Sequence, residues 1–210
     1  MASPLSLRQR KKEQTARTLW ATAIELFTEH GYDQVSIAQV AAAADVSKMT
    51  VFNYFATKED LVLKPLEQHT DEPARMVREC LAGGSGLSAL RQHVLTGIAE
   101  HDPMFGMSNS PQVLSVFRLV LDTPALFQRA AQSARESEVL LAAELGERLG
   151  EVVARIAAAQ IIGTLGALRL LNLQRLLAGE TPAEVEPDAL VNANIAFDIL
   201  EHGLGRYLTR

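Results

Sequence analysis

Cysteine is nearly absent from this 210-residue chain, and aromatic residues make up only 5% of it. The single cysteine, Cys80, excludes an intrachain disulfide and fits a reducing compartment. β-Branched residues never alternate in runs flanked by turn signals, which argues against β-strands. The hydrophobic residues, 48% of the chain, are mostly Ala and Leu, so the composition predicts an all-α protein large enough to bury a core.

Long hydrophobic runs are also lacking. The charged stretch 1–12 is not followed by the apolar run of about 7–15 residues that a secretory signal needs, so we expect a cytoplasmic protein. The most apolar segment, 156–168, is interrupted by Gln160 and Thr164 and is shorter than the roughly 20 residues that cross a bilayer. We therefore expect no membrane partner.

Positive charge is concentrated at the N-terminal end. Residues 1–64 carry eight Lys or Arg against seven Asp or Glu, whereas the rest of the chain carries twelve against eighteen. Five cations lie between Arg8 and Arg17, around the single acid Glu13. A basic cluster of this kind is found in polyanion-binding sites and equally on ordinary solvated surfaces.

A first helix is predicted over about residues 10–30. Its apolar residues recur at helical spacing, and Gly31 follows them as a stop signal. These apolar residues are Ala16, Leu19, Ala23, Leu26 and Phe27.

Three further helix starts follow, each marked by a hydroxyl residue that can cap it. Ser36, with Gln39 three residues later, forms a capping-box pattern before a short helix. Ser47 caps a second short helix, which runs to about residue 55, and Thr57 caps a third. Only two residues, Asp45-Val46, separate the first two of these short helices. The spacing predicts a helix-turn-helix, in which one helix crosses the DNA backbone and the next lies in the major groove.

The rest of the chain is predicted to be helical with several interruptions. Pro65 and Pro73 predict a kinked or broken helix after residue 58, and the glycine-rich stretch 83–86 predicts a loop. Further helices are predicted over about 87–100, 111–121, 124–149, 151–178 and 187–207. We expect a DNA-binding domain over residues 1–57 and a second domain over residues 58–210.

The stretch 31–61 contains Gly-Tyr, a Ser-capped helix, a turn with Ala, Val and Ser, and Thr-x-aromatic-x-Tyr-Phe followed by Lys-Glu-x-Leu. In these features it resembles the signature of the tetracycline-repressor (TetR) family of transcription regulators. The resemblance implies an N-terminal three-helix helix-turn-helix domain and a C-terminal helical domain for ligand binding and dimerisation. It further implies a regulator without catalytic activity, cofactor or metal. The expected function is repression, ended when a small, largely apolar ligand releases the protein from a pseudo-palindromic operator.

Two positions depart from the family pattern. Asp45 stands where Gly is usual in the turn, and Asp tolerates the left-handed region better than most residues. Phe52 stands where Tyr is common, so a phosphate contact by that hydroxyl is absent.

The exposed side of the predicted helix over 47–55 supplies the candidates for reading bases: Lys48, Met49, Thr50, Phe52 and Asn53. Of these, Asn53 can make bidentate hydrogen bonds to adenine. The resemblance implies phosphate contacts by Ser36, Ser47, Tyr54 and Lys58. The alternative roles are core packing for Tyr54 and a solvated helix start for Lys58.

A ligand site is expected in the middle of the chain, where apolar side chains and a few polar anchors occur together. The candidates are His93, His101, Met104, Phe105, Met107, Phe117 and Arg118. Such a mixture suits an apolar molecule held by a few directional groups. The alternative is plain core packing, with Arg118 paired to an acid such as Glu138.

Two long apolar helices are expected to form a homodimer as a four-helix interface about a twofold axis. The candidates are Ile161, Ile162, Leu165 and Leu168 on one helix and Ile195 and Ile199 on the other. The alternative is that both helices pack inside one subunit. A twofold dimer would set two recognition helices about one DNA turn, or a multiple of it, apart.

Other functional classes find little support. The sequence Gly-Ser-Gly-Leu-Ser-Ala at 84–89 fits a dinucleotide fingerprint, but no strand precedes it. The five histidines form no His-Glu-x-x-His motif, which leaves a metal-sensing role through Cys80, His93 and His101 as a weaker alternative. A helical adaptor without DNA function would not need the basic N-terminal segment.

Overall fold

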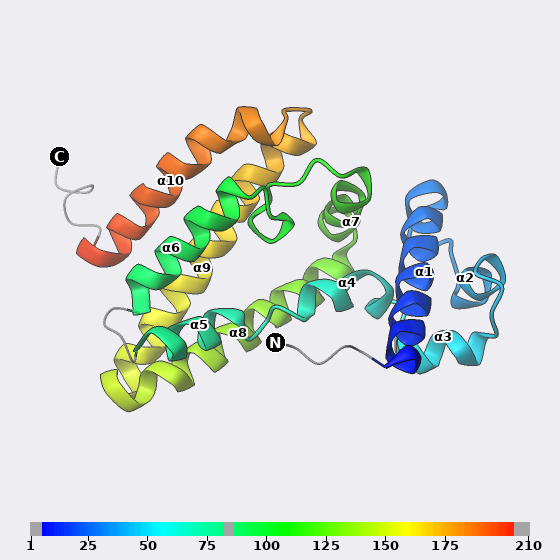
Figure 1. Ribbon diagram of the computed structural model, residues 1–210, viewed down its shortest axis with the longest axis horizontal. Coiled ribbons are helices and arrows are strands. Elements are labelled where there is room, and N and C mark those ends of the chain that lie inside the picture. Colours follow the sequence, from blue (N-terminus) through cyan, green and yellow to red (C-terminus); the bar gives the residue numbers. More distant parts are fainter. Residues whose placement is uncertain (1–5, 82–85, 204–210) are drawn as a thin grey trace. The chain divides into compact units, whose positions relative to one another are not determined.

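The computed structural model of this chain describes residues 6–81 and 86–203, and the regular structure within these ranges is entirely helical (Figure 1). In chain order the elements are α1 (Leu7–His30), α2 (Ile37–Ala43), α3 (Lys48–Tyr54), α4 (Asp60–Glu67), α5 (Glu72–Leu81), α6 (Gly86–Ala99), the 3₁₀ turn η1 (Pro103–Phe105), α7 (Pro111–Asp122), α8 (Pro124–Leu149), α9 (Glu151–Leu177) and α10 (Pro182–His202). The expected all-α class is confirmed.

The chain divides into two compact units. Met1–Glu67 and Ser115–Ala130 form the first unit, and Gln68–Leu114 and Ala131–Arg210 form the second. The expected boundary at residue 57 falls inside the first unit, because α4 packs on α1. The first unit also takes in the end of α7 and the start of α8, whose side chains share its core.

The first unit is built around the buried faces of α1 to α4. Leu19 and Phe27 of α1, Val40 of α2, Val51 of α3 and Leu61 of α4 are all almost fully buried in one cluster. Since α2 and α3 are only seven residues long, their stability depends on this shared core and on their caps.

The expected caps are present. The backbone N–H of Gln39 donates to the Ser36 hydroxyl (3.3 Å) while the Gln39 side chain accepts from the Ser36 N–H (2.8 Å), which is the predicted capping box. The Thr50 N–H donates to the Ser47 hydroxyl at 3.0 Å. Asp45, in the turn between α2 and α3, has φ of +52°, so the predicted left-handed turn residue is confirmed.

The helix after the DNA-binding region is broken rather than continuous. α4 contains Pro65 and ends at Glu67, and α5 begins at Glu72 with Pro73 as its second residue. Proline lacks the N–H that would bond to the preceding turn, which explains why the helix does not continue across this segment.

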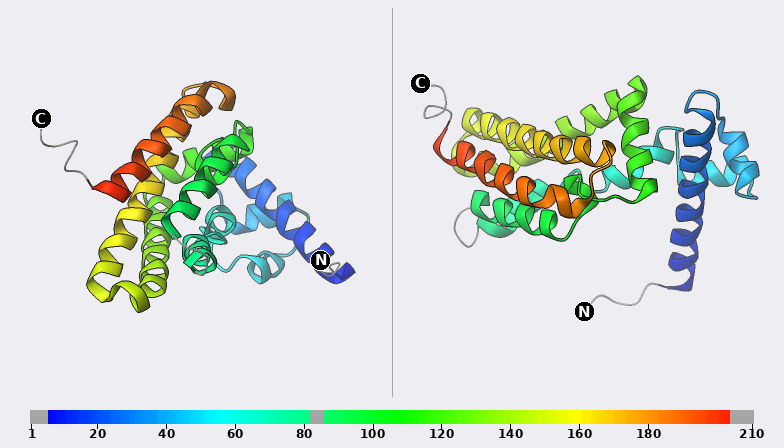
Figure 2. Two further views of the ribbon diagram at one scale, coloured as in Figure 1. Left: turned by 60° about the vertical axis from the view of Figure 1, so that its left-hand side comes forward. Right: turned by 90° about the horizontal axis from the view of Figure 1, so that it is seen from above.

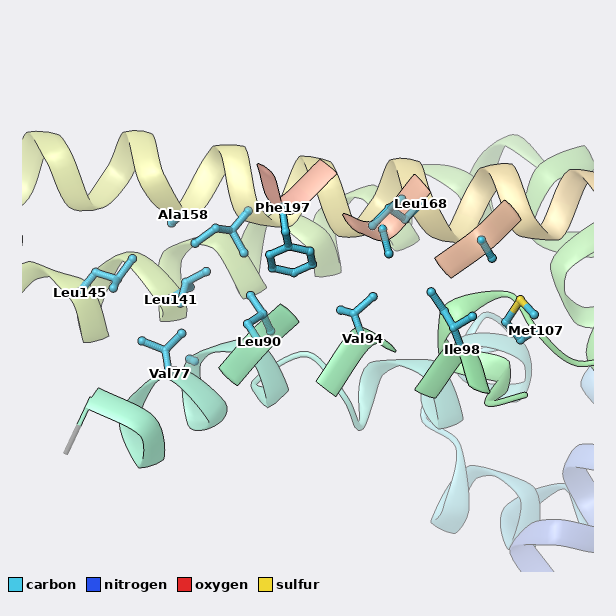
Figure 3. Packing of buried hydrophobic residues seen from close by; sticks show 14 of the residues in the cluster. Val77, Leu90, Val94, Ile98, Met107, Leu141, Leu145, Ala158, Leu168 and Phe197 are labelled. Atoms are coloured by element: carbon cyan, nitrogen blue, oxygen red, sulfur yellow. The ribbon is translucent and has the colours of Figure 1, made fainter. Parts of the chain in front are cut away.

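The second unit is a bundle in which α6 packs against α5 and α10, and α10 packs against α9. Figure 3 shows Phe197 of α10 pointing toward Leu90 of α6, below the ribbon of α9. Leu141 and Leu145, from the second half of α8, complete the same buried cluster. The backbone at Gly97 leaves room for the Phe105 ring, since a Cβ there would lie 2.1 Å from it.

Two helix starts differ from the expectation. α1 begins at Leu7 rather than near residue 10, because Ser6 caps it in a second capping box. α10 begins at Pro182 rather than Pro187, with Thr181 as cap and Glu184 as its capping-box partner. Proline is favoured in the first turn of a helix, and Pro182 rather than Pro187 occupies that position. The expected end near Tyr207 lies outside the described residues, and α10 ends at His202.

α9 is a long apolar helix, and much of its surface is exposed. An 18-residue window within it has a mean hydropathy of 1.5 and is only 28% buried, so by length and composition α9 could cross a membrane. A core helix of a soluble protein passes the same test. The views in Figure 2 show α9 and α10 lying side by side, and both present apolar side chains to solvent.

Candidate nucleic-acid interface

α3 presents a mixed polar and apolar face to solvent. Met49 is 69% exposed and Phe52 39% exposed, and Lys48 and Asn53 are exposed beside them. On the opposite side Val51 is fully buried in the core of the first unit. The structure therefore brings these four candidates together on one face, as the helical spacing predicts.

Thr50 differs from the other base-reading candidates. Its hydroxyl lies 2.8 Å from the Ser47 hydroxyl, and the residue is half-buried. Ser47 also caps the helix, so the two hydroxyls form a pair at the N-terminus of α3. Both Ser47 and Ser36 remain exposed at their helix starts. Their caps are therefore confirmed, and their phosphate contacts stay a prediction.

Lys58 is engaged within the protein. Its ammonium donates to the Tyr32 carbonyl at 2.5 Å and lies 4.2 Å from the centre of the Tyr32 ring. Burial lowers the pKa of Lys58 below its usual range, although Asp33 and Glu59 oppose this. The side chain thus ties the segment just before α4 to the loop after α1, and its phosphate contact stays a prediction.

Tyr54 and Lys64 are linked at the end of α3. The Lys64 ammonium donates to the Tyr54 carbonyl at 2.6 Å. The half-buried Tyr54 side chain packs against the core of the first unit. Lys64 thereby bonds to the last carbonyl group of α3, where a cation favourably meets the negative end of the helix dipole.

The basic N-terminal segment continues α1 as a helix. Arg10, Lys11, Lys12 and Arg17 are all exposed on it. The side chain of Arg8 lies outside the described part of the structure. These four cations fall within the helix predicted over about residues 10–30, and the structure places that helix in the unit that contains α3.

A buried ion-pair network fixes the turn between α3 and α4. Asp60, which is 8% exposed, accepts hydrogen bonds from the backbone N–H of Ala56 (2.8 Å) and of Thr57 (3.3 Å). Arg129, from the first turns of α8, contacts Asp60 at 2.6 Å, the Thr57 hydroxyl at 2.9 Å and the Glu67 carboxylate at 2.8 Å. One guanidinium therefore holds both ends of α4 and the turn that directly follows α3.

The charges of this network stabilise each other. Burial alone would raise the pKa of Asp60, but hydrogen bonds from Arg129 and Thr57 lower it on balance. Burial would likewise lower the pKa of Arg129, and the hydrogen bonds to Glu67 and Asp60 raise it on balance. Both groups are thus held in their charged forms. No sequence pattern indicated this network, because Arg129 lies more than 60 residues from its partners.

The expected ligand residues are only partly brought together. His93 and Phe105 meet edge to face at 5.4 Å between ring centres, within the second unit. Met107 is fully buried in the core of that unit, and Met104 is half-buried in the turn before it. Phe117 and the exposed Arg118 belong to the first unit.

The two histidines do not converge on a common metal position. His93 Nε2 lies 3.5 Å from Glu72, whereas His101 Nε2 lies 2.8 Å from Glu186. The side chain of Cys80 lies outside the described residues. The second unit also has a pocket of about 280 Å³ near the end of α9. Its lining residues are Leu171, Asn172, Gln174, Arg175, Ala178, Glu180 and Asn192. None of the expected ligand residues lines it.

The expected dimerisation residues differ in exposure. Ile161 and Leu168 are buried in the core of their own unit, and Ile162, Leu165 and Ile199 are half-buried. Only Ile195 is exposed, at 44%. The exposed apolar side chains on these helices are instead Val152, Val153, Ile156, Leu170 and Leu171 of α9 and Val191 and Ile195 of α10. Gly163 and Ala167 lie on the same exposed face of α9.

Comparisons with known proteins agree with this architecture. Residues 19–64, which include α2 and α3, match the family model described as bacterial regulatory proteins, tetR family. The chain is 30% identical over 146 residues to the HTH-type transcriptional regulator TcmR of Streptomyces glaucescens. This match covers 69% of the chain and 64% of TcmR, so the chain spans just under two thirds of that relative.

Solved structures share the fold. NalD of Pseudomonas aeruginosa, the secondary repressor of a multidrug efflux pump, superposes with a TM-score of 0.58 at 19% identity, over 91% of this chain and 97% of NalD. FadR of Bacillus subtilis in complex with stearoyl-CoA gives a TM-score of 0.53 at 19% identity, over 89% of this chain and 98% of FadR.

Proposed function

We infer that this chain, a member of the TetR family of bacterial regulatory proteins, is a one-component transcription regulator whose first unit binds operator DNA. It is not an enzyme, and its relatives are named as transcriptional regulators. It acts as a repressor in the cytoplasm. Binding of a small, largely apolar effector to the second unit releases it from the operator.

The exposed face of α3 is the observation that supports DNA binding most strongly. Lys48 and Asn53 offer hydrogen-bond donors, and Met49 and Phe52 offer apolar surface for the thymine methyl group. The exposed cations at the start of α1 supply charge for the phosphate backbone. α3 is held from behind by Val51 in the core and from its C-terminal end by the Asp60–Arg129 pair.

A homodimer follows from the exposed apolar face of α9 and α10. Ile156 is 55% exposed and Val191 57% exposed, and the small residues Gly163 and Ala167 allow another backbone to approach α9 closely. Exposed apolar surface of this extent on two adjacent helices marks an interaction site in a soluble protein. We place the twofold axis at this face rather than at the buried Ile161 and Leu168.

The effector is expected to bind in the second unit. His93, Phe105 and Met104 gather where η1 packs on α6 and α9. FadR, which shares the fold, was solved in complex with stearoyl-CoA, and that complex supports a small-molecule effector for this chain as well.

A double substitution in α3 tests the proposal. Lys48→Ala with Asn53→Ala should reduce affinity for the selected operator at least about 100-fold, while binding to unrelated duplex changes far less. The matched control is Gln132→Ala with Arg135→Ala, which removes an exposed amide and cation on α8 and should leave operator affinity unchanged. Fluorescence anisotropy with both duplexes measures the result. Unchanged operator affinity in the α3 variant would show that α3 is not the helix that reads the operator bases.

A further inference from the structure

The arginines that connect helices of the second unit each have a polar partner. Arg78 contacts Glu144 at 2.7 Å, and Arg91 donates to the side-chain carbonyl oxygen of Asn194 at 2.6 Å. Arg175 contacts both Glu180 and Asp188. In each case the guanidinium joins two helices, or the end of one helix to the start of the next.

Arg169 of α9 is different. Its side chain is half-buried, yet it forms no hydrogen bond and no ion pair with any residue in the described part of the chain. Burial lowers the pKa of Arg169, and no neighbouring carboxylate raises it again. The guanidinium is therefore a partly desolvated cation without a counterion among the described residues, an arrangement that costs free energy unless another group neutralises it.

Arg169 lies where the loop containing η1 crosses α9. A Cβ at Gly106 would lie 2.5 Å from the Arg169 carbonyl, so the loop backbone rests directly on this turn of the helix. One turn later the Asn172 side-chain amide donates to the Phe105 carbonyl at 2.9 Å. Phe105 in turn meets His93 of α6.

The surroundings of Arg169 along α9 are apolar. A helical side chain points back toward the N-terminus and covers the preceding turn, which here contains the half-buried Leu165 and, one turn further, Ile162. Leu173, one turn after Arg169, is almost completely buried. A molecule that reached the guanidinium would therefore also contact apolar side chains.

We propose that Arg169 binds a carboxylate or phosphate group of the effector, so that the effector is an amphiphilic anion with an apolar body. This inference rests on the proposed function, since it names the chemical class of the ligand of the second unit. The planar guanidinium offers paired donors that match both anionic groups. The anion supplies the counterion that residues 6–81 and 86–203 do not provide.

The unliganded protein gives the first test. Arg169→Met keeps the length and apolar stem of the side chain and removes the unpaired charge, so it should raise the Tm of the unliganded protein by at least about 2 °C. The control, Arg175→Met, removes a guanidinium that has two acidic partners and should lower the Tm. A lower Tm for Arg169→Met would mean that the arginine is structural, and would overturn the proposal.

Matched probes give the second test. Octanoate and octyl phosphate should each raise the Tm of the wild-type protein but not that of Arg169→Met, and their relative effects distinguish carboxylate from phosphate. Octan-1-ol, the neutral match, should act equally on both proteins. Equal shifts of the two proteins with either anion, or no shift of the wild type with both, would contradict the proposal.

Operator binding separates this inference from the proposed function. Unliganded Arg169→Met should bind the selected operator with wild-type affinity, because Arg169 lies outside the first unit. If the operator is bound and the anion tests fail, only the ligand class is wrong. If neither protein prefers any operator, the proposed function itself fails.

Discussion

The two units of this protein differ in whether their charged and apolar groups find partners within the same unit. In the first unit the key charges are paired inside it: Arg129 has Asp60 and Glu67, and Lys58 has the Tyr32 carbonyl. The second unit leaves the guanidinium of Arg169 without a partner in the described residues. It also exposes an apolar face on α9 and α10.

This difference matches the division of labour that we propose. A unit that reads DNA must hold a short helix rigidly, since α3 has only seven residues and little stability of its own. A unit that responds to a ligand and joins a second copy must keep binding surface that its own chain does not cover. The following predictions test two points. The first is that the charges of the first unit depend on partners within it, and the second is that the second unit needs a second copy of the chain.

The largest effect is expected at the exposed face of α9. Ile156→Glu places a charge on the proposed dimer face, once in each copy, and should weaken dimerisation at least about 100-fold. Sedimentation velocity over a range of concentrations measures this. Met49→Glu changes an even more exposed apolar residue, in the first unit, and is the control that should leave the dimer intact. An unchanged dimer in Ile156→Glu would place the interface elsewhere.

Removal of Arg129 should have the next largest effect. Arg129→Gln leaves the buried Asp60 without its main partner and should destabilise the first unit by about 2 kcal/mol, with weaker operator binding because the turn after α3 is no longer held. Trp20 reports the unfolding, since it is the only tryptophan and packs on the core of this unit. Arg129→Lys should restore part of the loss. Wild-type stability and operator affinity in Arg129→Gln would show that the network is incidental.

The stability of the first unit should depend on pH through Asp60. The pKa of this carboxyl is depressed in the folded state, so its contribution is fully present above its unfolded pKa of about 3.9 and is lost as the pH falls through the lower, folded value. Asp60→Asn should therefore cost about 1 kcal/mol at pH 6 and progressively less toward pH 3. Urea unfolding followed by Trp20 fluorescence checks this. A difference that stays constant between pH 6 and pH 3 would contradict it.

The smallest effect is expected in the turn before α3. Asp45 has φ of +52°, which glycine adopts without strain, so Asp45→Gly should stabilise the first unit by up to about 1 kcal/mol. Asp45→Ala cannot relieve the strain and should destabilise it. Thermal unfolding of the two variants gives the comparison, and equal stabilities would show that the turn is not strained at Asp45.

Local signals in the sequence predicted the first unit well. The caps at Ser36 and Ser47 and the left-handed Asp45 are decided by residues within a few positions of each other. Contacts between residues far apart in the sequence could not be predicted. Arg129 is the clearest case, because nothing near it in the sequence indicates that it pairs with Asp60. The early start of α10 was missed because Pro182 and Pro187 give the same signal, and only the Thr181–Glu184 capping box separates them.

Hydrophobic spacing could not separate core from interface in the second unit. Ile156 and Ile161 lie on the same helix and have the same side chain, yet the first is 55% exposed and the second 8% exposed. The spacing of apolar residues predicts that α9 packs on two sides, but it does not indicate which side faces its own subunit. Spacing could not identify the ligand residues for the same reason. Methionine occurs both in pockets and in cores, and Met107 lies in the core.

Selection of bound fragments from genomic DNA tests the central claim most directly. If two α3 helices of a symmetric dimer lie in the major groove, the fragments will share a pseudo-palindrome whose half-sites are centred about one turn of DNA, ~34 Å, or a multiple of it, apart. Nuclease footprinting will then show protection of both half-sites. Fragments without a common sequence, or with one unpaired half-site bound by a monomer, would contradict it.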